Sequence, residues 1–332
     1  MAPIGCCASA FTELVNKMKR GRFWRYSRWD AILAIVPIIQ FVAILGWAFD
    51  FQHLAWQWNF VIFPLFALAF YFNPIVVVHN FLHCPFFAWN PLNRAFAAFN
   101  SMNLGLPLVL YKHHHMIHHR YGNDPVEDGT TLDPTSTFRY GEEGKQEHFV
   151  TYSVLSLFRD ASAYAYAESI RRGNRVQLFL EVGTNVLGYA LLIAINWQWF
   201  LLAYVPLFYA GWFLAHMENY FEHYRATDPL IRFANAVSFY PIWYNRLMFN
   251  EGYHQEHHIE PGRHWSKRPA VGARYRTQLV TAGAYEARFP PLLGFLDSHQ
   301  RLNSRRSIAG GSRLSERIGA MWCLLIRRVG PT

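Results

Sequence analysis

Charged residues are scarce in this sequence, and their scarcity argues against an ordinary soluble domain. Of the 332 residues, 16% are charged and 52% are hydrophobic, whereas about 25% of a typical soluble domain is charged. Two long stretches, between Trp29 and Asn93 and between Val176 and Tyr224, contain no lysine or arginine. Each stretch has room for two membrane spans of ~20 residues. The composition therefore predicts an integral membrane protein.

Cysteine is also rare, and its four occurrences form no CxxC pair. No disulfide framework is therefore expected, in keeping with a reducing compartment. No segment resembles a nucleic-acid-binding module, so no nucleic-acid partner is expected. The net charge of +9 has two interpretations. It follows from the positive charge that membrane proteins keep on their cytoplasmic side, or it provides a basic face for an anionic partner such as an acidic electron carrier.

The apolar segments predict an all-α fold with four membrane-spanning helices in two hairpins and a cytoplasmic helical cap. The four spans cover residues 31–49, 59–78, about 178–195 and about 200–215. Six basic residues precede the first span: Lys17, Lys19, Arg20, Arg22, Arg25 and Arg28. They place both termini in the cytoplasm, for a multi-pass protein of a bacterial inner membrane or an equivalent membrane. Residues 1–303 are expected to form one domain, and residues 304–332 a basic tail that is surface-bound or disordered.

Most of the 16 histidines fall into spaced motifs. HNFLH holds His79 and His83, HHHMIHH holds His115, His118 and His119, and HQEHH holds His254, His257 and His258. Residues three and four positions apart share one helix face, and all three motifs emerge on the cytoplasmic side of the predicted spans. So many imidazoles exceed the four ligands of a usual zinc site. They indicate more than one transition metal, with iron favoured where the chemistry uses oxygen.

These motifs, HxxxH and two copies of HxxHH, resemble the histidine boxes of the membrane fatty acid desaturase/hydroxylase superfamily. HNFLHCPFF resembles the first box of acyl-lipid desaturases, NEGYHQEHH resembles a box of stearoyl-type desaturases, and ENYFEHY resembles a motif of alkane monooxygenases. The resemblance extends roughly from the first span to Pro261. Two positions depart from these patterns: Asn80 stands where acyl-lipid desaturases usually carry aspartate, and Arg225 where alkane monooxygenases carry glycine.

The resemblance implies a non-haem centre of two iron ions. Ten residues match the family's ligand positions: His79, His83, His115, His118, His119, Asn219, His223, His254, His257 and His258. Among them, Asn219 matches the position that reaches one iron through water. Four histidines outside the pattern are expected to support the ligands or merely to lie nearby: His113, His114, His216 and His264. Five carboxylates are either solvated surface groups or acceptors that orient ligand imidazoles: Asp124, Glu218, Glu222, Glu251 and Glu256.

The resemblance also implies a reaction, the O2-dependent oxidation of an unactivated C–H bond in a fatty acyl chain, with desaturation expected first. Hydroxylation, oxidative decarboxylation to a terminal alkene and carotenoid-type oxygenation are alternatives within the superfamily. The acyl substrate is a free acid, a thioester or a lipid. The electron donor is expected to be a separate ferredoxin or cytochrome b5, because the sequence shows no flavin or nicotinamide fingerprint. A non-catalytic membrane metal or haem protein is the alternative of a different class.

Overall fold

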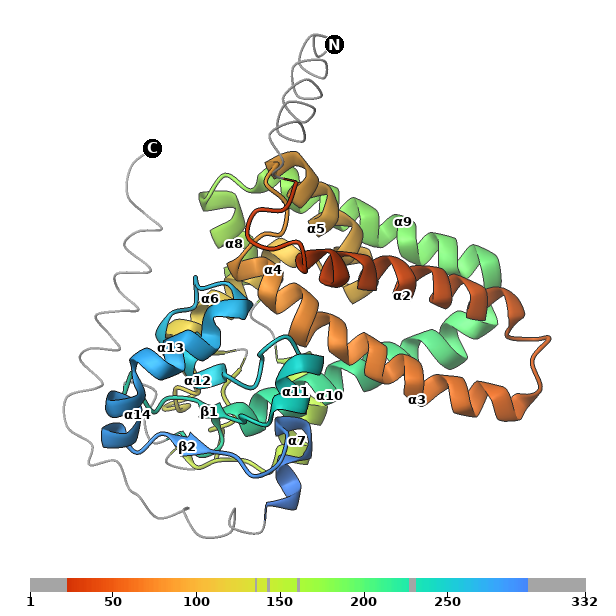
Figure 1. Ribbon diagram of the computed structural model, residues 1–332. Helices are drawn as coiled ribbons and strands as arrows, with labels where there is room; N and C mark the ends of the chain where they lie inside the picture. Colours follow the sequence, from red (N-terminus) through yellow and green to blue (C-terminus); the bar gives the residue numbers. More distant parts are fainter. Residues whose placement is uncertain (1–22, 135, 142–143, 160–161, 227–230, 298–332) are drawn as a thin grey trace.

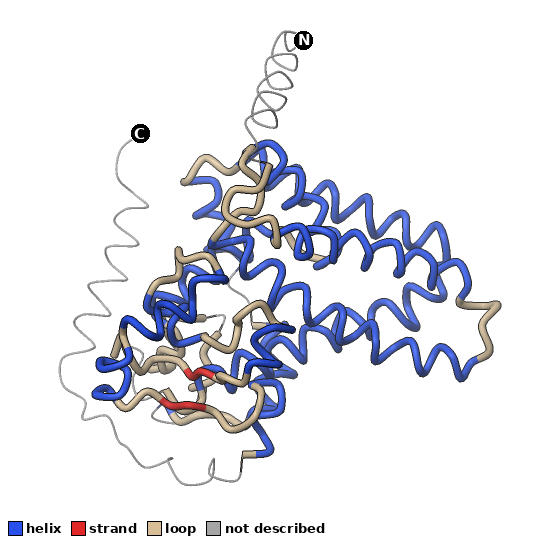
Figure 2. The backbone as a smooth tube through the Cα atoms, in the orientation of Figure 1, coloured by secondary structure: helices blue, strands red, loops and turns tan. Residues whose placement is uncertain are grey.

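The structure, a computed structural model, describes residues 23–134, 136–141, 144–159, 162–226 and 231–297. These residues are mostly helical, and the longest helices extend together from one side of a more irregular part (Figure 1). The basic tail at 304–332 and the first four of the six basic residues before the first span lie outside the described residues. The all-α expectation needs a small correction, because β1 (Val237–Ser238) pairs in parallel with β2 (Tyr285–Glu286) (Figure 2).

Three helical segments among the described residues are long and apolar enough to cross a membrane. The first is α2 (Asp30–Asp50). The second joins α3 (Trp56–Phe72), the π-helical turn η1 (Asn73–Val78) and α4 (His79–His83) into one continuous helix. Less than half of each apolar stretch is buried inside the protein. Side chains such as Phe60 and Leu187 are 72% and 70% exposed, which suits a surface that faces lipid.

The third segment runs through α9 (Arg175–Trp199), the π-helical turn η4 (Phe200–Tyr204) and α10 (Val205–His223). It is not straight, because Asn196 has the non-helical angles φ −160° and ψ 92°. The Asn196 side chain accepts a hydrogen bond from the Trp199 amide at 2.9 Å and donates one to the Ala48 carbonyl at 3.2 Å. Figure 1 shows that the chain turns back at this end, so that α9 and α10 form two separate arms.

Buried amides join the long helices to α5 (Asn90–Leu104). Asn73 donates to Gln40 of α2 and to Asn100 of α5, both at 2.8 Å, and Asn100 donates back to Asn73 at 2.9 Å. All three side chains are buried. Polar contacts of this kind hold apolar helices in one register, because lipid offers these groups no other partner.

The turn between α5 and α6 (Leu108–Tyr121) requires a glycine. Gly105 ends α5 in the left-handed region, with φ +71°. This backbone conformation is strained for any residue that carries a side chain. A Cβ atom at this position would lie 2.5 Å from both the Phe208 ring and the Tyr189 hydroxyl. The close approach lets α9 and α10 pack against the turn that begins α6.

Short helices at one end of the long helices form the irregular part of the molecule (Figure 1). They are α6, α7 (Phe149–Leu155), η3 (Ser156–Phe158), α8 (Ser162–Arg171), α11 (Ile242–Leu247), α12 (His254–Ile259), η5 (Trp265–Lys267), α13 (Arg268–Arg274), α14 (Arg276–Ala282) and η6 (Pro291–Leu296). Asp30, the first residue of α2, is fully buried and accepts hydrogen bonds from His264 Nε2 at 2.9 Å and Trp265 Nε1 at 2.8 Å. This contact docks the start of η5 onto the start of the first long helix.

Gly105→Ala is expected to lower the free energy of unfolding by about 1–3 kcal/mol, because it combines a strained φ with steric overlap. Gly46→Ala is the matched control, since a Cβ at Gly46 in α2 meets nothing within 4 Å; it should be neutral or stabilise the helix by up to ~1 kcal/mol. Thermal unfolding of the two variants in the same detergent makes the comparison. Equal melting temperatures would contradict the tight turn.

Candidate metal centre

Nine of the ten predicted ligand residues form two groups in which the possible ligand atoms all lie within 4.8 Å of one another. The first group contains His79, His83, His115, His119 and His257. The second contains His118, His223, His254 and His258. The two groups adjoin, since the rings of His119 and His258 have centroids 4.4 Å apart. The site therefore has two neighbouring points at which imidazoles converge.

Each HxxHH motif contributes to both groups. On α6, His115 and His119 are four residues apart and belong to the first group, whereas His118 belongs to the second. On α12 the division is reversed, because His254 and His258 belong to the second group and His257 to the first. The two short helices thus lie across both points. α4 completes the first group with His79 and His83, and the last residue of α10, His223, completes the second.

Ring nitrogens within a group approach one another closely. The Nε2 atoms of His79 and His257 are 2.7 Å apart, as are those of His83 and His115. His119 Nε2 lies 3.0 Å from the Nε2 atoms of both His115 and His257. Neutral imidazoles cannot satisfy all these contacts with ordinary hydrogen bonds, because the Nε2 atoms of His115, His119 and His257 each have two contacts but only one N–H or one lone pair. Lone pairs that converge in this way suit a metal cation.

Burial keeps these imidazoles uncharged. It holds the pKa well below the usual 6.5 for the six ligand candidates on α6 and α12, and neighbouring imidazoles or Arg268 lower it further: His115, His118, His119, His254, His257 and His258. A neutral imidazole is the form that binds a metal. The Nε2 atom of His258 is buried and has no hydrogen-bond partner among the described residues. The donor set therefore fits metal ions at both points.

Several ligand imidazoles are fixed through their other nitrogen. Glu251 Oε2 lies 2.7 Å from His79 Nδ1, and the His223 Nδ1 atom lies 3.0 Å from a backbone oxygen, the carbonyl of Asn235. These two hydrogen bonds set the tautomer and turn Nε2 toward the points where the imidazoles converge. Glu222 Oε1 lies 3.3 Å from His254 Nδ1 without a hydrogen bond between them. Two of the five candidate carboxylates therefore contact ligand rings.

The other candidate carboxylates have different partners. Glu218 accepts a hydrogen bond from the Tyr244 hydroxyl at 2.9 Å. Glu256 accepts from Ser238 and Tyr240, both at 2.8 Å. Asp124 accepts from the backbone amide of Leu132 at 2.9 Å.

A hydroxyl rather than a carboxylate supports His118. Ser136 Oγ lies 2.7 Å from His118 Nδ1 and donates a hydrogen bond to Asp133, which is fully buried. Asp133 is held in turn by the backbone amide of Asn123 at 2.8 Å. Sequence reasoning missed this relay, because Ser136 and Asp133 lie in a loop without a periodic pattern. The HxxHH spacing gives no information about which loop residue faces the helix.

Sequence reasoning also missed Arg268, which explains the unusual Asn80. Glu251 accepts a hydrogen bond from Asn80 Nδ2 at 2.7 Å, and its Oε1 atom lies 2.8 Å from Arg268 Nη1. Arg268 Nη2 donates to Asn80 Oδ1 at 3.0 Å. Glu251 and Arg268 are each 1% exposed. The amide of Asn80 can donate to one charged partner and accept from the other, which an aspartate could not do.

The remaining predicted residues lie around the two groups. Asn219 lies beside the second group, and its Nδ2 atom donates to the Tyr152 hydroxyl at 2.7 Å. His114 and His216 line a pocket next to the metal groups, whereas His264 binds Asp30 at the start of α2. His113 is buried, and its Nε2 atom has no hydrogen-bond partner among the described residues.

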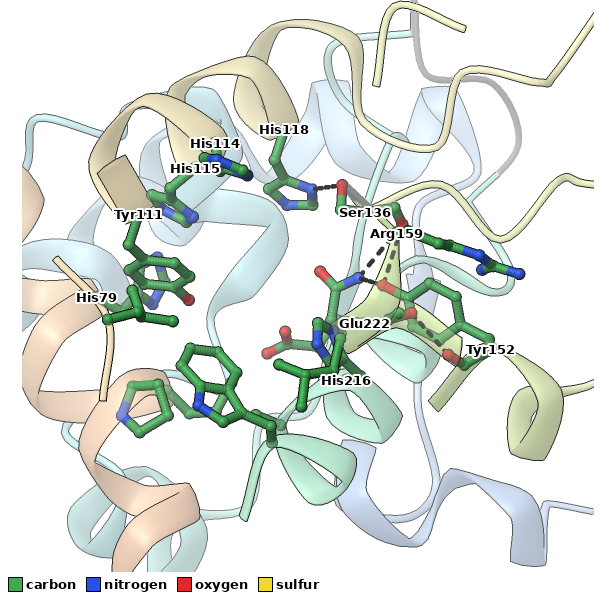
Figure 3. A pocket seen from close by; sticks show the side chains of 18 of the residues that line it. His79, Tyr111, His114, His115, His118, Ser136, Tyr152, Arg159, His216 and Glu222 are labelled. Carbon is green, nitrogen blue, oxygen red and sulfur yellow. Dashed lines mark hydrogen bonds between the residues drawn. The ribbon is translucent and has the colours of Figure 1, made fainter. Parts of the chain in front are cut away.

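A cavity of about 220 Å³ opens beside both histidine groups. Its apolar lining comes from the long helices, α6, the turn before α6 and η3: Pro74, Ile75, Leu106, Tyr111, Leu157, Trp212 and Ala215. In Figure 3, His79 and Tyr111 stand at one end of the pocket and Ser136, Tyr152 and Arg159 at the other. His118 and Glu222 lie between them. An alkyl chain in this space would pass directly along the imidazoles.

A family model described as fatty acid desaturase matches residues 56–290. The chain belongs to the fatty acid desaturase family. Membership gives the enzyme class, an oxidoreductase, and a lipid as the kind of substrate. The matched residues contain all nine histidines of the two groups.

Curated relatives of this desaturase include the sphingolipid delta(4)-desaturases DES1. The protein from Homo sapiens is 28% identical over 250 residues, which cover 70% of each chain. The protein from Bos taurus is 27% identical over 248 residues, or 69% of this chain and 68% of the relative. The protein from Mus musculus is 26% identical over 244 residues, or 70% of this chain and 68% of the relative. No solved structure matches this chain.

Asn80→Asp is expected to destabilise the desaturase by about 2–4 kcal/mol, because it sets a second carboxylate against Glu251 in a buried site. The Asn80→Asp/Glu251→Gln double variant restores a single carboxylate and should recover most of that loss. Asn90→Asp is the control, since Asn90 is exposed and accepts a hydrogen bond from Arg25. Unfolding in denaturant measures all three. A double variant no more stable than Asn80→Asp would contradict the role given to the amide.

The metal-free desaturase should lose stability as the pH falls from about 7.5 to about 5.5. The lowered pKa values mean that the unfolded chain, with histidines near 6.5, takes up protons before the folded protein does; His113, lowered to about 4 by burial, adds to the effect. Asp133 and Glu256 act the other way, because burial raises the pKa of both carboxyl groups, that of Asp133 to about 6. Outside the long helices, these are two carboxyl groups against seven imidazoles. Melting temperatures across this range test the sign, and a constant or rising value toward low pH would contradict it.

Proposed function

We propose that the nine histidines hold two iron ions and that the enzyme uses O2 to desaturate the alkyl chain of a membrane lipid. The proposal rests on one observation: the histidine boxes form two adjoining groups beside a cavity with an apolar lining. The two groups together contain nine imidazoles, which is more ligands than one metal ion binds. When bound, two irons would supply the oxidising power that no side chain has for an unactivated C–H bond.

The protein's own residues would position the substrate and protect the site. The apolar wall of the cavity, which includes Ile75, Leu106 and Trp212, would hold the alkyl chain and exclude water. Glu251 and Ser136 would keep the imidazoles of His79 and His118 oriented through hydrogen bonds. Asn219, which borders the cavity, would reach one metal through a water molecule. Each role is one of binding or orientation.

Desaturation is favoured over the other reactions of the superfamily by the matched family model and by the names of the relatives. Those relatives are named for sphingolipids, and a long-chain lipid is accordingly the substrate class proposed here. Hydroxylation and oxidative decarboxylation would use the same metal groups and differ in the carbon that reaches them. A haem carrier is disfavoured, because haem iron takes few axial ligands and two separate groups converge here.

The proposal includes four membrane spans and a cytoplasmic catalytic face. The reversal at Asn196 supports a division of the third apolar segment into two spans, α9 and α10. Both histidine groups then lie at the same end of all long helices. Arg25 and Arg28 precede α2 at that end, which supports its cytoplasmic location.

A separate protein, a ferredoxin or cytochrome b5, would deliver the electrons. The net charge of the chain is +9. Lys267, Arg274 and Arg276 are exposed on the short helices around the metal groups. A basic surface of this kind favours encounter with an acidic electron carrier.

His118→Ala and His257→Ala remove one ligand from each group and are each expected to abolish turnover and to lower the iron bound by the purified enzyme. His53→Ala is the control, since His53 is exposed in the turn after α2. Iron analysis and lipid mass spectrometry of cells that express each variant provide the two measurements. Full activity of either ligand variant would rule out the proposed centre.

A further inference from the structure

Two imidazoles in the cavity lining, His114 and His216, belong to neither histidine group, and His216 is the one that lies between the Trp212 and Tyr152 rings. His216 lies on α10, seven residues before His223, which corresponds to about 10 Å along the helix axis. It lines the cavity together with His118 and Asn219 and is partly exposed. The same helix therefore supplies a metal-group residue at its end and a second imidazole two turns away.

His216 belongs to a row of aromatic rings along the cavity. Ring centroids are 5.7 Å apart for Tyr111 and Trp212, 5.9 Å for Trp212 and His216, and 5.8 Å for His216 and Tyr152. These rings come from α6, α10 and α7. The row can hold an extended chain, and aromatic neighbours on both sides fix the orientation of the His216 ring.

The ring nitrogens of His216 make no hydrogen bond to any described residue, whereas neighbouring polar groups are already engaged. The Tyr152 hydroxyl donates to the Ser136 carbonyl at 3.2 Å and accepts from Asn219 at 2.7 Å. Ser136 Oγ is bonded to Asp133 and His118. A polar group of the substrate could therefore form a hydrogen bond with His216 without breaking any existing hydrogen bond of the protein.

The charges around the cavity favour an uncharged partner. Arg159, a guanidinium in the lining, pairs with Glu147 through both of its terminal nitrogens, with Nη2 2.8 Å from Oε2, and lies 3.8 Å from the centre of the Tyr140 ring. Glu222 adds a carboxyl group to the same lining. A free carboxylate would meet a guanidinium that is already neutralised and an acidic side chain, so it would be desolvated without compensation.

We propose that His216 hydrogen-bonds an uncharged hydroxyl or amide group of the substrate and thereby selects lipids that carry such a group near the oxidised carbon. This inference rests on the proposed function and names the substrate class for the same cavity. His216 is then a specificity residue that acts through binding. The selected group would lie about two helical turns along α10 from His223, and a free fatty acid is disfavoured.

The test uses the full-length, iron-loaded enzyme with His216→Phe and the conservative variants His216→Asn and His216→Gln. Substrates are a long-chain N-acyl amino alcohol, the free acid and the thioester of the same chain. With the N-acyl amino alcohol, His216→Phe should raise KM about tenfold at unchanged kcat and unchanged iron content. One of the two amide variants should restore KM, because Asn and Gln keep a hydrogen-bonding group. His53→Phe should change neither constant.

An unchanged KM for His216→Phe, or wild-type turnover of the free acid alone, would overturn the inference. Should His216→Phe fail to accumulate, the comparison of His216→Asn and His216→Gln across the three substrates decides the same question, since loss of selectivity is expected in at least one. Iron content separates this outcome from failure of the proposed function. Two bound irons together with turnover of the free acid would contradict only the role of His216. The absence of bound iron would contradict both that role and the proposed function.

Discussion

Nine imidazoles, five of them buried and four half-buried, converge on two points, and the rest of the structure depends on holding them there. A buried ring that took up a proton would repel its neighbours, some of which lie within 3 Å. Burial lowers the pKa of the imidazoles on α6 and α12, and hydrogen-bonded contacts at Nδ1 orient the rings of His79, His118 and His223. Burying so many polar groups is unfavourable for folding, and the apolar side chains buried in the adjoining core stabilise the fold.

The long helices supply fixed positions for this arrangement. The π-helical turn at Asn73–Val78 precedes His79 directly, in a helix whose amides bond to α2 and α5. α10 carries His223 on its last turn. α6 and α12 are short and lie across both groups, so each joins the two points. The metal groups are thus built from the ends of long, well-anchored helices and from two short helices held between them.

Much of this could be predicted from the sequence, because histidine spacing and the absence of charge are periodic or local signals. The membrane helices, the family and the convergence of the boxes followed from such signals. The division of each box between two groups did not, since i, i+3 and i+4 residues share a face and their finer directions depend on packing. Arg268 and Ser136 were missed because their contacts join positions far apart in sequence, and the two-residue strands are too short to leave a pattern.

One cavity is lined both by histidines of the two groups and by apolar side chains, so a molecule bound there would lie next to the imidazoles. The central claim is that two iron ions occupy the two histidine groups. Metal analysis together with the optical spectrum of the purified enzyme tests it most directly. Two irons per chain and no Soret band are expected; a single metal ion per chain, or the absorption of haem, would contradict the presence of two iron ions.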